Sequence, residues 1–169
     1  PLTIDRNNLP VTYTWNDNSL IDTFTGLSGR TTEYIYDPAN GIDLNEIRTN
    51  LGSVIMDYDD KHRLTDHWDY LNRHTHITYN QYGQVDTVTN SNLEVTTYNY
   101  NALHQLETIT KAGETLASYT YDSFDRIKTK TNSAGIKLTY HYDNLNHITK
   151  IEYPDGRFVE RTYNSCPRM

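Results

Sequence analysis

Four histidines lie close together in the sequence and are the first candidates for a metal site. His74 and His76 alternate, so on a strand both imidazoles point to the same face, with His62 and His67 nearby. A zinc site needs three or four ligands that converge on one point. His62 also has another explanation, because it occupies a turn position of the repeat described below. We therefore expect ordinary exposed strand histidines, with no metal ligand and no cofactor.

The acidic segment of residues 37–46 is a second candidate, for calcium. It carries Asp37, Asn40, Asp43, Asn45 and Glu46. A calcium-binding loop alternates its oxygen ligands regularly and ends in a bidentate glutamate at the twelfth position, and this segment does neither. Asp37 is also the aspartate that recurs in each repeat. We expect a turn here and no calcium site.

Four closely spaced carboxylates, Asp57, Asp59, Asp66 and Asp69, have the residue types of a glycosidase pair. Such catalysis needs a pocket and two carboxyl groups held in different environments. A repeat sequence places aspartates periodically whether or not chemistry occurs. We therefore predict that these residues are not catalytic.

Cys166 is the one cysteine, so an internal disulfide is impossible, and its thiol is the remaining candidate nucleophile. No base is placed beside it by the sequence. It stands at a repeat position that is apolar in earlier copies, namely at Tyr82, Leu103, Phe124 and Leu145. We interpret Cys166 as a small apolar residue and predict that the chain is not an enzyme.

An aromatic residue that precedes Asp or Asn recurs along the whole chain and defines a repeat. These markers are Trp15, Tyr36, Tyr58, Tyr79, Tyr100, Tyr121, Tyr142 and Tyr163. The intervals between them are 21, 22, 21, 21, 21, 21 and 21 residues. We predict one array of about eight 21-residue repeats over residues 1–169, and we interpret it as a fragment of a longer protein.

Three other positions repeat with the marker. Two residues before it stand Tyr13, Tyr34, Met56, Ile77, Tyr98, Tyr119, Tyr140 and the exception Arg161. One residue after it stand Asn16, Asp37, Asp59, Asn80, Asn101, Asp122, Asp143 and Asn164. Six residues after it stand Ile21, Ile42, Leu64, Val85, Leu106, Ile127 and Ile148. The repeat therefore has a fixed polar and apolar pattern.

The fourth residue after the marker is the most informative about the backbone. It is Ser19, Asn40, His62, Gly83, His104, Asp125 or Asn146 in successive copies. Apart from the serine, these residue types tolerate a positive φ best. Together with the preceding Asp or Asn, which can bond to the backbone ahead, they predict a tight turn with one left-handed residue.

A second turn signal, such as Ala112-Gly113 or Ala134-Gly135, follows in each copy, and short stretches rich in Thr, Tyr, Val and Ile lie between the turns. Two turns and two strands per repeat predict one β-hairpin. The expected fold is all-β, with tandem hairpins in a long, twisted, curling antiparallel sheet. Ile42–Arg48 is the one weak helix candidate.

The composition limits the function classes. A net charge of −7 argues against a nucleic-acid groove, and no apolar run is long enough to span a bilayer. The first residues lack the form of a signal peptide. The 15 Tyr far outnumber the 3 Phe and 2 Trp. Because tyrosine buries its ring and keeps a polar hydroxyl, we expect a thin, half-wetted layer in place of a deep core.

The unit Tyr119-Thr-Tyr121-Asp122-Ser-Phe-Asp-Arg126-Ile127 resembles the YD repeat of the RHS family. Residues 98–106 and 140–148 match nearly as well, and consecutive copies cover essentially the whole chain. The glycine that commonly precedes the arginine is present only as Gly83. The copies at Met56, Ile77 and Arg161 depart furthest from the pattern.

The resemblance implies a segment of a large secreted or cell-surface protein, such as a bacterial polymorphic toxin, a Tc toxin component or a teneurin. In these proteins the repeats form a β-sheet shell, which in toxins encloses a C-terminal effector. The expected partners are therefore flanking repeats and such an effector. The alternative is a carbohydrate-binding or adhesion module, in which sugars stack on exposed tyrosines; its candidates are Tyr98, Tyr100, Tyr119 and Tyr121.

An open sheet leaves unpaired backbone groups at both edges. Repeat arrays also usually need atypical caps at their ends. The irregular copy at Arg161 is a candidate cap. We expect the isolated chain to associate edge to edge with other copies or to be only marginally stable.

Overall fold

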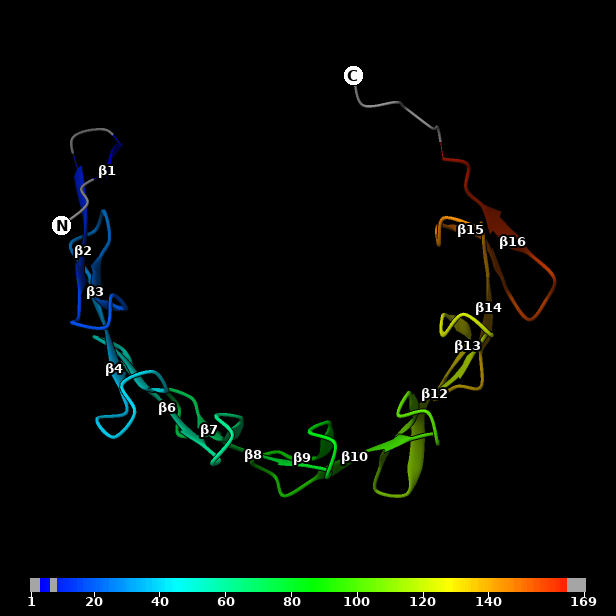
Figure 1. Cartoon of the computed structure of the whole chain (residues 1–169), viewed down its shortest axis with the longest axis horizontal. Coiled ribbons are helices and arrows are strands. Elements are labelled where there is room, and N and C mark those ends of the chain that lie inside the picture. The colour runs from blue at the N-terminus through cyan, green and yellow to red at the C-terminus, as the bar shows by residue number, and fades with distance from the viewer. Residues whose placement is uncertain (1–3, 7–8, 164–169) are drawn as a thin grey trace. The chain divides into compact units, whose positions relative to one another are not determined.

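The computed structural model of the chain describes residues 4–6 and 9–163, with side chains from residue 11 onward. Every regular element in the described ranges is a β-strand, so the predicted all-β class is confirmed. None of the described elements is a helix of the length and apolarity that a membrane crossing requires. The chain forms two compact units, residues 1–93 and 94–169 (Figure 1).

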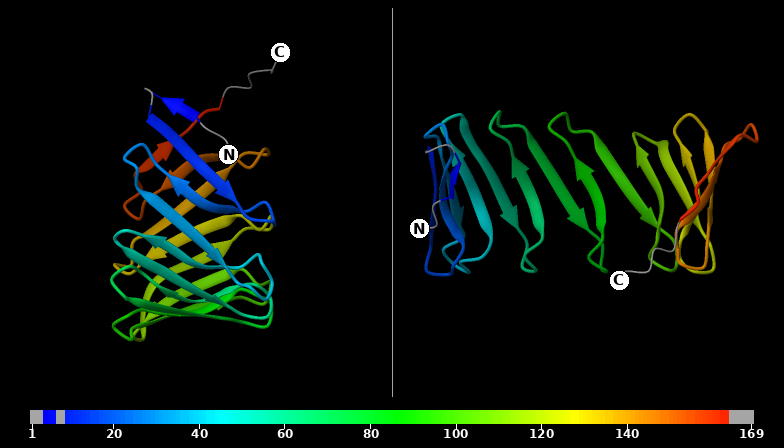
Figure 2. Two further views of the ribbon diagram at one scale, coloured as in Figure 1. Left: turned by 90° about the vertical axis from the view of Figure 1, so that its left-hand side faces the viewer. Right: turned by 90° about the horizontal axis from the view of Figure 1, so that it is seen from above.

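The strands of each unit pair in sequence order, each antiparallel to the one before it (Figure 2). The first unit contains β1 (Ile4–Arg6), β2 (Leu9–Trp15), β3 (Ile21–Thr25), β4 (Thr31–Tyr36), β5 (Leu44–Thr49), β6 (Gly52–Tyr58), β7 (Leu64–Trp68), β8 (His74–Tyr79) and β9 (Val85–Thr89). The second contains β10 (Val95–Tyr100), β11 (Leu106–Lys111), β12 (Glu114–Tyr121), β13 (Ile127–Asn132), β14 (Lys137–Tyr142), β15 (Ile148–Glu152) and β16 (Phe158–Glu160).

The turn after the marker has the predicted left-handed residue in six copies. In the third repeat, Asp59 Oδ1 accepts hydrogen bonds from the backbone N–H groups of Lys61 and Arg63, at 2.9 and 3.0 Å. His62 then adopts a φ of 60°, and a bulge shifts the register between Asp57 and Tyr58. A type I turn followed by a left-handed residue and a bulge is a common hairpin connection. Positive φ is found at the predicted residues Ser19, His62, Gly83, His104, Asp125 and Asn146.

The second repeat departs from the prediction. Its left-handed residue is Gly41, with a φ of 70°, and not Asn40. Ile42 is 56% exposed, and Leu44 takes the place expected for it as the cross-strand partner of Tyr36. The weak helix candidate over residues 42–48 is not a helix, because Leu44–Thr49 forms β5.

Two opposite changes in length within the second repeat explain why its left-handed residue was misplaced. The backbone N–H of Asp37 bonds to the carbonyl of Asp43, six residues ahead, whereas Asn16 bonds to Leu20, four residues ahead. The loop is therefore two residues longer than its counterpart. The later hairpin of the same repeat is one residue shorter, so the marker spacing shows a net change of only one.

The two faces of each sheet differ in chemistry. Residues that face each other across neighbouring strands lie on the same side of the sheet. One side carries the tyrosines and aliphatic residues, as in the pairing of Tyr98 with Ile109 and of Ile109 with Ala117. The other side is polar, and there the hydroxyls of Thr120 and Thr129 are 2.7 Å apart.

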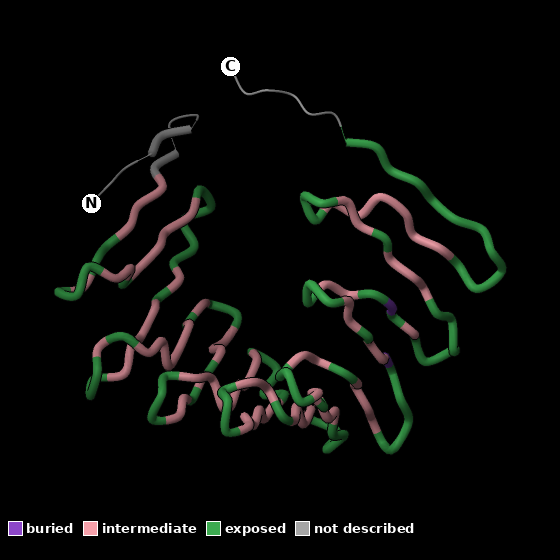
Figure 3. The backbone as a smooth tube through the Cα atoms, turned by 45° about the vertical axis from the view of Figure 1, so that its right-hand side comes forward, coloured by how far each residue is buried: buried purple, intermediate pink, exposed green. Residues whose placement is uncertain are grey.

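The described part of the chain has almost no buried core. Only Ala117 and Thr129 fall in the buried class, with relative exposures of 8% and 7%. Figure 3 shows most strand residues as half-buried and the turns as exposed. This is the thin, half-wetted layer that the tyrosine-rich composition predicts. Stability must therefore come from contacts between neighbouring strands.

The variant Gly41→Ala tests the corrected turn. A left-handed backbone costs an alanine about 1 kcal/mol. A Cβ on Gly41 would also collide with the amide of Asn18, whose Nδ2 donates a 3.0 Å hydrogen bond to the Gly41 carbonyl. Losing that bond costs about 1 kcal/mol more. We expect urea unfolding to show a loss of about 2 kcal/mol for Gly41→Ala.

Gly135→Ala is the matched control. Gly135 has a φ of 76° and open space around its Cα. Its substitution by alanine should cost only the strain of the left-handed backbone, about 1 kcal/mol. Equal losses for the two variants would contradict the placement of Gly41 against Asn18.

Candidate functional site: the junctions between repeats

The hydroxyls of six marker tyrosines make the same contact with the preceding repeat. Each donates a hydrogen bond to a backbone carbonyl 14 or 15 residues earlier in the chain. The donor and acceptor pairs are Tyr36 and Ile21 (3.0 Å), Tyr58 and Leu44 (3.1 Å), Tyr79 and Leu64 (2.7 Å), Tyr121 and Leu106 (2.7 Å), Tyr142 and Ile127 (2.8 Å), and Tyr163 and Ile148 (3.0 Å).

Each of these hydroxyls bonds to a carbonyl that lies just beyond the end of the backbone pairing between two neighbouring strands. The ladder between β13 and β14 ends at Thr129, and the carbonyl that Tyr142 reaches lies two residues further, at Ile127. The same offset occurs between β7 and β8, where the ladder ends at Asp66 and Tyr79 reaches Leu64. An unpaired carbonyl is costly when it is shielded from water. The tyrosine satisfies it while its ring fills the space between the strands.

We call this contact between a marker tyrosine and the carbonyl of the preceding repeat a junction. In three copies the side chain of the residue just before the one that supplies the carbonyl covers the tyrosine ring. The guanidinium of Arg63 lies 4.4 Å from the ring centre of Tyr79, and that of Arg126 lies 4.5 Å from that of Tyr142. In the last described copy, His147 stacks on Tyr163 at 4.5 Å. Cation–π contacts of this kind contribute about 0.5–1 kcal/mol at exposed sites.

The arginine also closes its own turn. Arg126 forms an ion pair with Asp122 at 2.7 Å, and its Nη1 donates to the carbonyl of Asp143 in the next repeat at 3.1 Å. The sequence motif contains this arginine, but sequence reasoning assigned it no role. The arginine recurs at this place only as Arg63 and Arg126, so the sequence carried little signal of the contact with the next tyrosine.

Burial favours the protonated, hydrogen-donating form of four marker hydroxyls. It raises the pKa of Tyr36, Tyr58, Tyr121 and Tyr142 above the usual value, with smaller contributions from nearby acidic groups. These tyrosines therefore remain protonated near neutral pH.

The four tyrosines proposed for sugar stacking are half-buried, and none lies in the exposed class. Tyr121 is engaged in a junction, and Tyr119 lies beneath the ammonium of Lys130, 5.8 Å from the ring centre. The large apolar side chains that are most exposed in the second unit lie in turns, at Leu103, Phe124 and Leu145.

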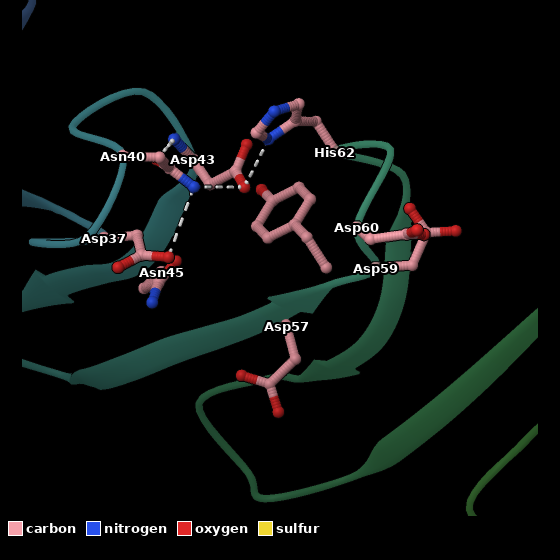
Figure 4. Close-up of a pocket in the computed structure, with 9 residues that line it drawn as sticks. Asp37, Asn40, Asp43, Asn45, Asp57, Asp59, Asp60 and His62 are labelled. Carbon is pink, nitrogen blue, oxygen red and sulfur yellow. Dashed lines mark hydrogen bonds and ion pairs between the residues drawn. The ribbon is translucent and has the colours of Figure 1, made fainter.

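An acidic cleft of about 520 Å³ lies beside the enlarged loop of the second repeat (Figure 4). Oxygens of Asp37 and Asp43 in this cleft accept hydrogen bonds from neighbouring side chains. Asn40 Nδ2 donates to Asp37 at 3.2 Å and to Asp43 at 2.8 Å, and the His62 ring lies 2.9 Å from the same Asp43 oxygen. That contact raises the pKa of His62. The cleft is a hydrogen-bonded turn network.

Of the carboxylates considered for catalysis, Asp57 and Asp59 line this acidic cleft, whereas Asp66 and Asp69 do not. Asp59 pairs with Arg63, and Asp69 pairs with Arg73, each at 2.6 Å within its own turn. Asp57 is the cross-strand partner of Asp66. Cys166 and Asn164 lie outside the described residues.

The structure brings together residues that the sequence treated separately. Asp66 Oδ1 lies 2.8 Å from His74 Nε2 and 2.8 Å from His76 Nδ1. His67 is not part of this cluster, because it pairs with Met56 on the other face of the sheet. His62 belongs to the acidic cleft.

The pKa of Asp59 provides a test of the arginine contact. Hydrogen bonds from the Arg63 side chain and backbone lower this pKa from 3.8 to about 2. Because the pKa of Asp59 is lower in the folded state than in the unfolded state, its contact with Arg63 stabilises the fold above pH 3.8, and this stabilisation is lost as the pH falls toward 2. We expect NMR titration of the carboxyl carbon to give a pKa of about 2, and Arg63→Gln to raise it toward 3.8.

Arg30→Gln removes an arginine of another turn and should leave the Asp59 titration unchanged. An Asp59 pKa near 3.8 in the unmodified chain would show that Arg63 does not hold this turn.

Comparisons with known proteins agree with this repeat architecture. The model of the Teneurin YD-shell family matches residues 54–169. No curated protein sequence matches the chain. Among solved structures, the crystal structure of TcdB2-TccC3 without its hypervariable C-terminal region has a TM-score of 0.77 at 15% identity, over 92% of this chain and 10% of that one.

Two further solved structures are similar. The crystal structure of TcdB2-TccC3-Cdc42 has a TM-score of 0.73 at 16% identity, over 88% of this chain and 9% of that one. The Photorhabdus luminescens Tc holotoxin pore has a TM-score of 0.69 at 16% identity, with the same coverage. The chain thus spans about a tenth of the length of these relatives, and the likeness is one of fold. Because the family model covers more than half of the chain, the chain belongs to the Teneurin YD-shell family and is a scaffold of RHS/YD repeats.

Proposed function

We propose that the chain is a segment of a β-sheet wall that encloses or presents a C-terminal effector in a secreted bacterial toxin. The observation that carries this proposal is the junction between repeats. It joins each hairpin to the one before it without a central core, so that a single layer of sheet can extend by adding copies. A layer of this kind can enclose a volume.

The wall has two chemically different sides. The tyrosine-rich side can pack against neighbouring repeats or an enclosed polypeptide, and the threonine-rich side is suited to water. The solved relatives are described as Tc toxin components, one of them prepared without a hypervariable C-terminal region. This supports, as partners, flanking repeats and an effector at the C-terminal end of the parent protein. It also supports a secreted or cell-surface location.

We propose that this role involves no catalysis and no sugar binding. Asp59 and Asp69 are neutralised by arginines, and the candidate stacking tyrosines are half-buried. The edge-to-edge association predicted from the sequence is part of the same proposal. In a complete wall the flanking repeats would cover the sheet edges, whereas in the isolated chain these edges are open and can pair with other copies.

Limited proteolysis of the parent polypeptide tests the wall. We expect its C-terminal segment to be digested at least about tenfold more slowly within the intact protein than as a free domain, because an enclosed chain must be released before cleavage. The double variant Tyr121→Ala/Tyr142→Ala removes two junctions and should abolish this protection. The control Leu145→Ser changes an exposed turn residue and should preserve it.

Equal digestion of the enclosed and free segments would contradict the wall. Glycan-array binding by the 169-residue chain that is lost in Tyr100→Ala or Tyr121→Ala would favour the adhesion alternative.

A further inference from the structure

We propose that Asp66, His74 and His76 form a binding site for a divalent transition metal, with Zn²⁺ as the ion that fits best. The site lies on the polar face of the paired strands β7 and β8. None of its ligands is a junction tyrosine, so the site can be tested apart from the wall function.

The strand register assembles the three ligands. Asp66 is the direct cross-strand partner of His76, and Trp68 is the partner of His74. Since side chains alternate along a strand, all four residues lie on one face. The nearest ligand atoms of Asp66, His74 and His76 lie within 4.8 Å of one another. In the described part of the chain, no other group of His, Cys, Asp and Glu side chains converges in this way.

The spacing is close to that of a coordinated ion. Zinc binds imidazole nitrogen and carboxylate oxygen at about 2.0–2.2 Å, which places tetrahedral ligands about 3.3 Å apart. Both imidazole nitrogens are now 2.8 Å from the same oxygen, Asp66 Oδ1. An ion would need to separate these atoms by about half an ångström, which small side-chain rotations supply.

The site is accessible but partly ordered. The His74 and His76 side chains are 42% and 44% exposed, and that of Asp66 is 21% exposed. An ion can therefore enter from solvent, and water can take a fourth position. The His74 ring stacks on Trp68 with centres 4.5 Å apart and planes 10° apart, which fixes its orientation before binding.

The ligand types select the metal. Calcium and magnesium prefer sets made of oxygen, whereas two imidazoles and one carboxylate suit zinc and its transition-metal neighbours. Asp57, the cross-strand partner of Asp66 on β6, adds a negative charge on the same face. A bound ion would link β7 to β8 and stabilise their pairing, because the backbone ladder between them is only three residue pairs long.

Calorimetric titration of the untagged 169-residue chain with Zn²⁺ tests the site. We expect one equivalent to bind and the thermal unfolding midpoint to rise with zinc concentration. Asp66→Asn and His76→Gln should each weaken binding more than the roughly 10-fold that loss of an outer-shell partner costs. His141→Gln is the matched control, since His141 faces a single carboxylate, Glu152, at 3.2 Å. It should bind zinc as the unmodified chain does, and so should Cys166→Ser.

A second measurement needs no variant. Imidazole nitrogen NMR signals of the unmodified chain should move on zinc addition at His74 Nε2 and His76 Nδ1, while those of His67 stay in place. Zinc binding that persists unchanged in Asp66→Asn and His76→Gln, or shifts confined to other histidines, would overturn the proposal. So would loss of binding in Cys166→Ser, or no binding by the unmodified chain.

Discussion

The hydrogen bond from a marker tyrosine to a carbonyl of the preceding repeat is the interaction on which the rest of the structure depends. Backbone pairing between one hairpin and the next stops two residues before that carbonyl. The tyrosine ring fills the gap, and its hydroxyl satisfies the carbonyl. A phenylalanine could fill the same space but could not donate the bond. This explains the choice of tyrosine over phenylalanine at the six marker positions whose hydroxyls make the bond.

The junction also explains how a sheet without a core can be ordered. Each repeat contacts mainly its neighbours, so stability is approximately a sum over hairpins and the interfaces between them. In two copies the Asp of the turn holds an arginine, Arg63 or Arg126, and that arginine covers the tyrosine of the next copy. The recurring aspartates and tyrosines thus have a structural role that does not require chemistry.

Much of this architecture could be predicted from the sequence because it is local and repeated. The period, the turn at residues such as His62 and Asp125, and the hairpins all follow from residue types that restrict the backbone. The enlarged loop could not be predicted by counting, because a two-residue insertion and a one-residue deletion nearly cancel. The Asp66 cluster was also missed, since it depends on the register that pairs Asp66 with His76. The covering of Tyr142 by Arg126 depends on the twist between hairpins, which no local pattern specifies.

The free energy of unfolding of Tyr121→Phe, compared with that of Tyr119→Phe, tests the central claim most directly. Both rings lie on the same face of β12, but only the Tyr121 hydroxyl donates a hydrogen bond within the described part of the chain. The junction account predicts a loss of about 1 kcal/mol for Tyr121→Phe and a change below about 0.5 kcal/mol for Tyr119→Phe. Equal effects of the two substitutions would contradict it.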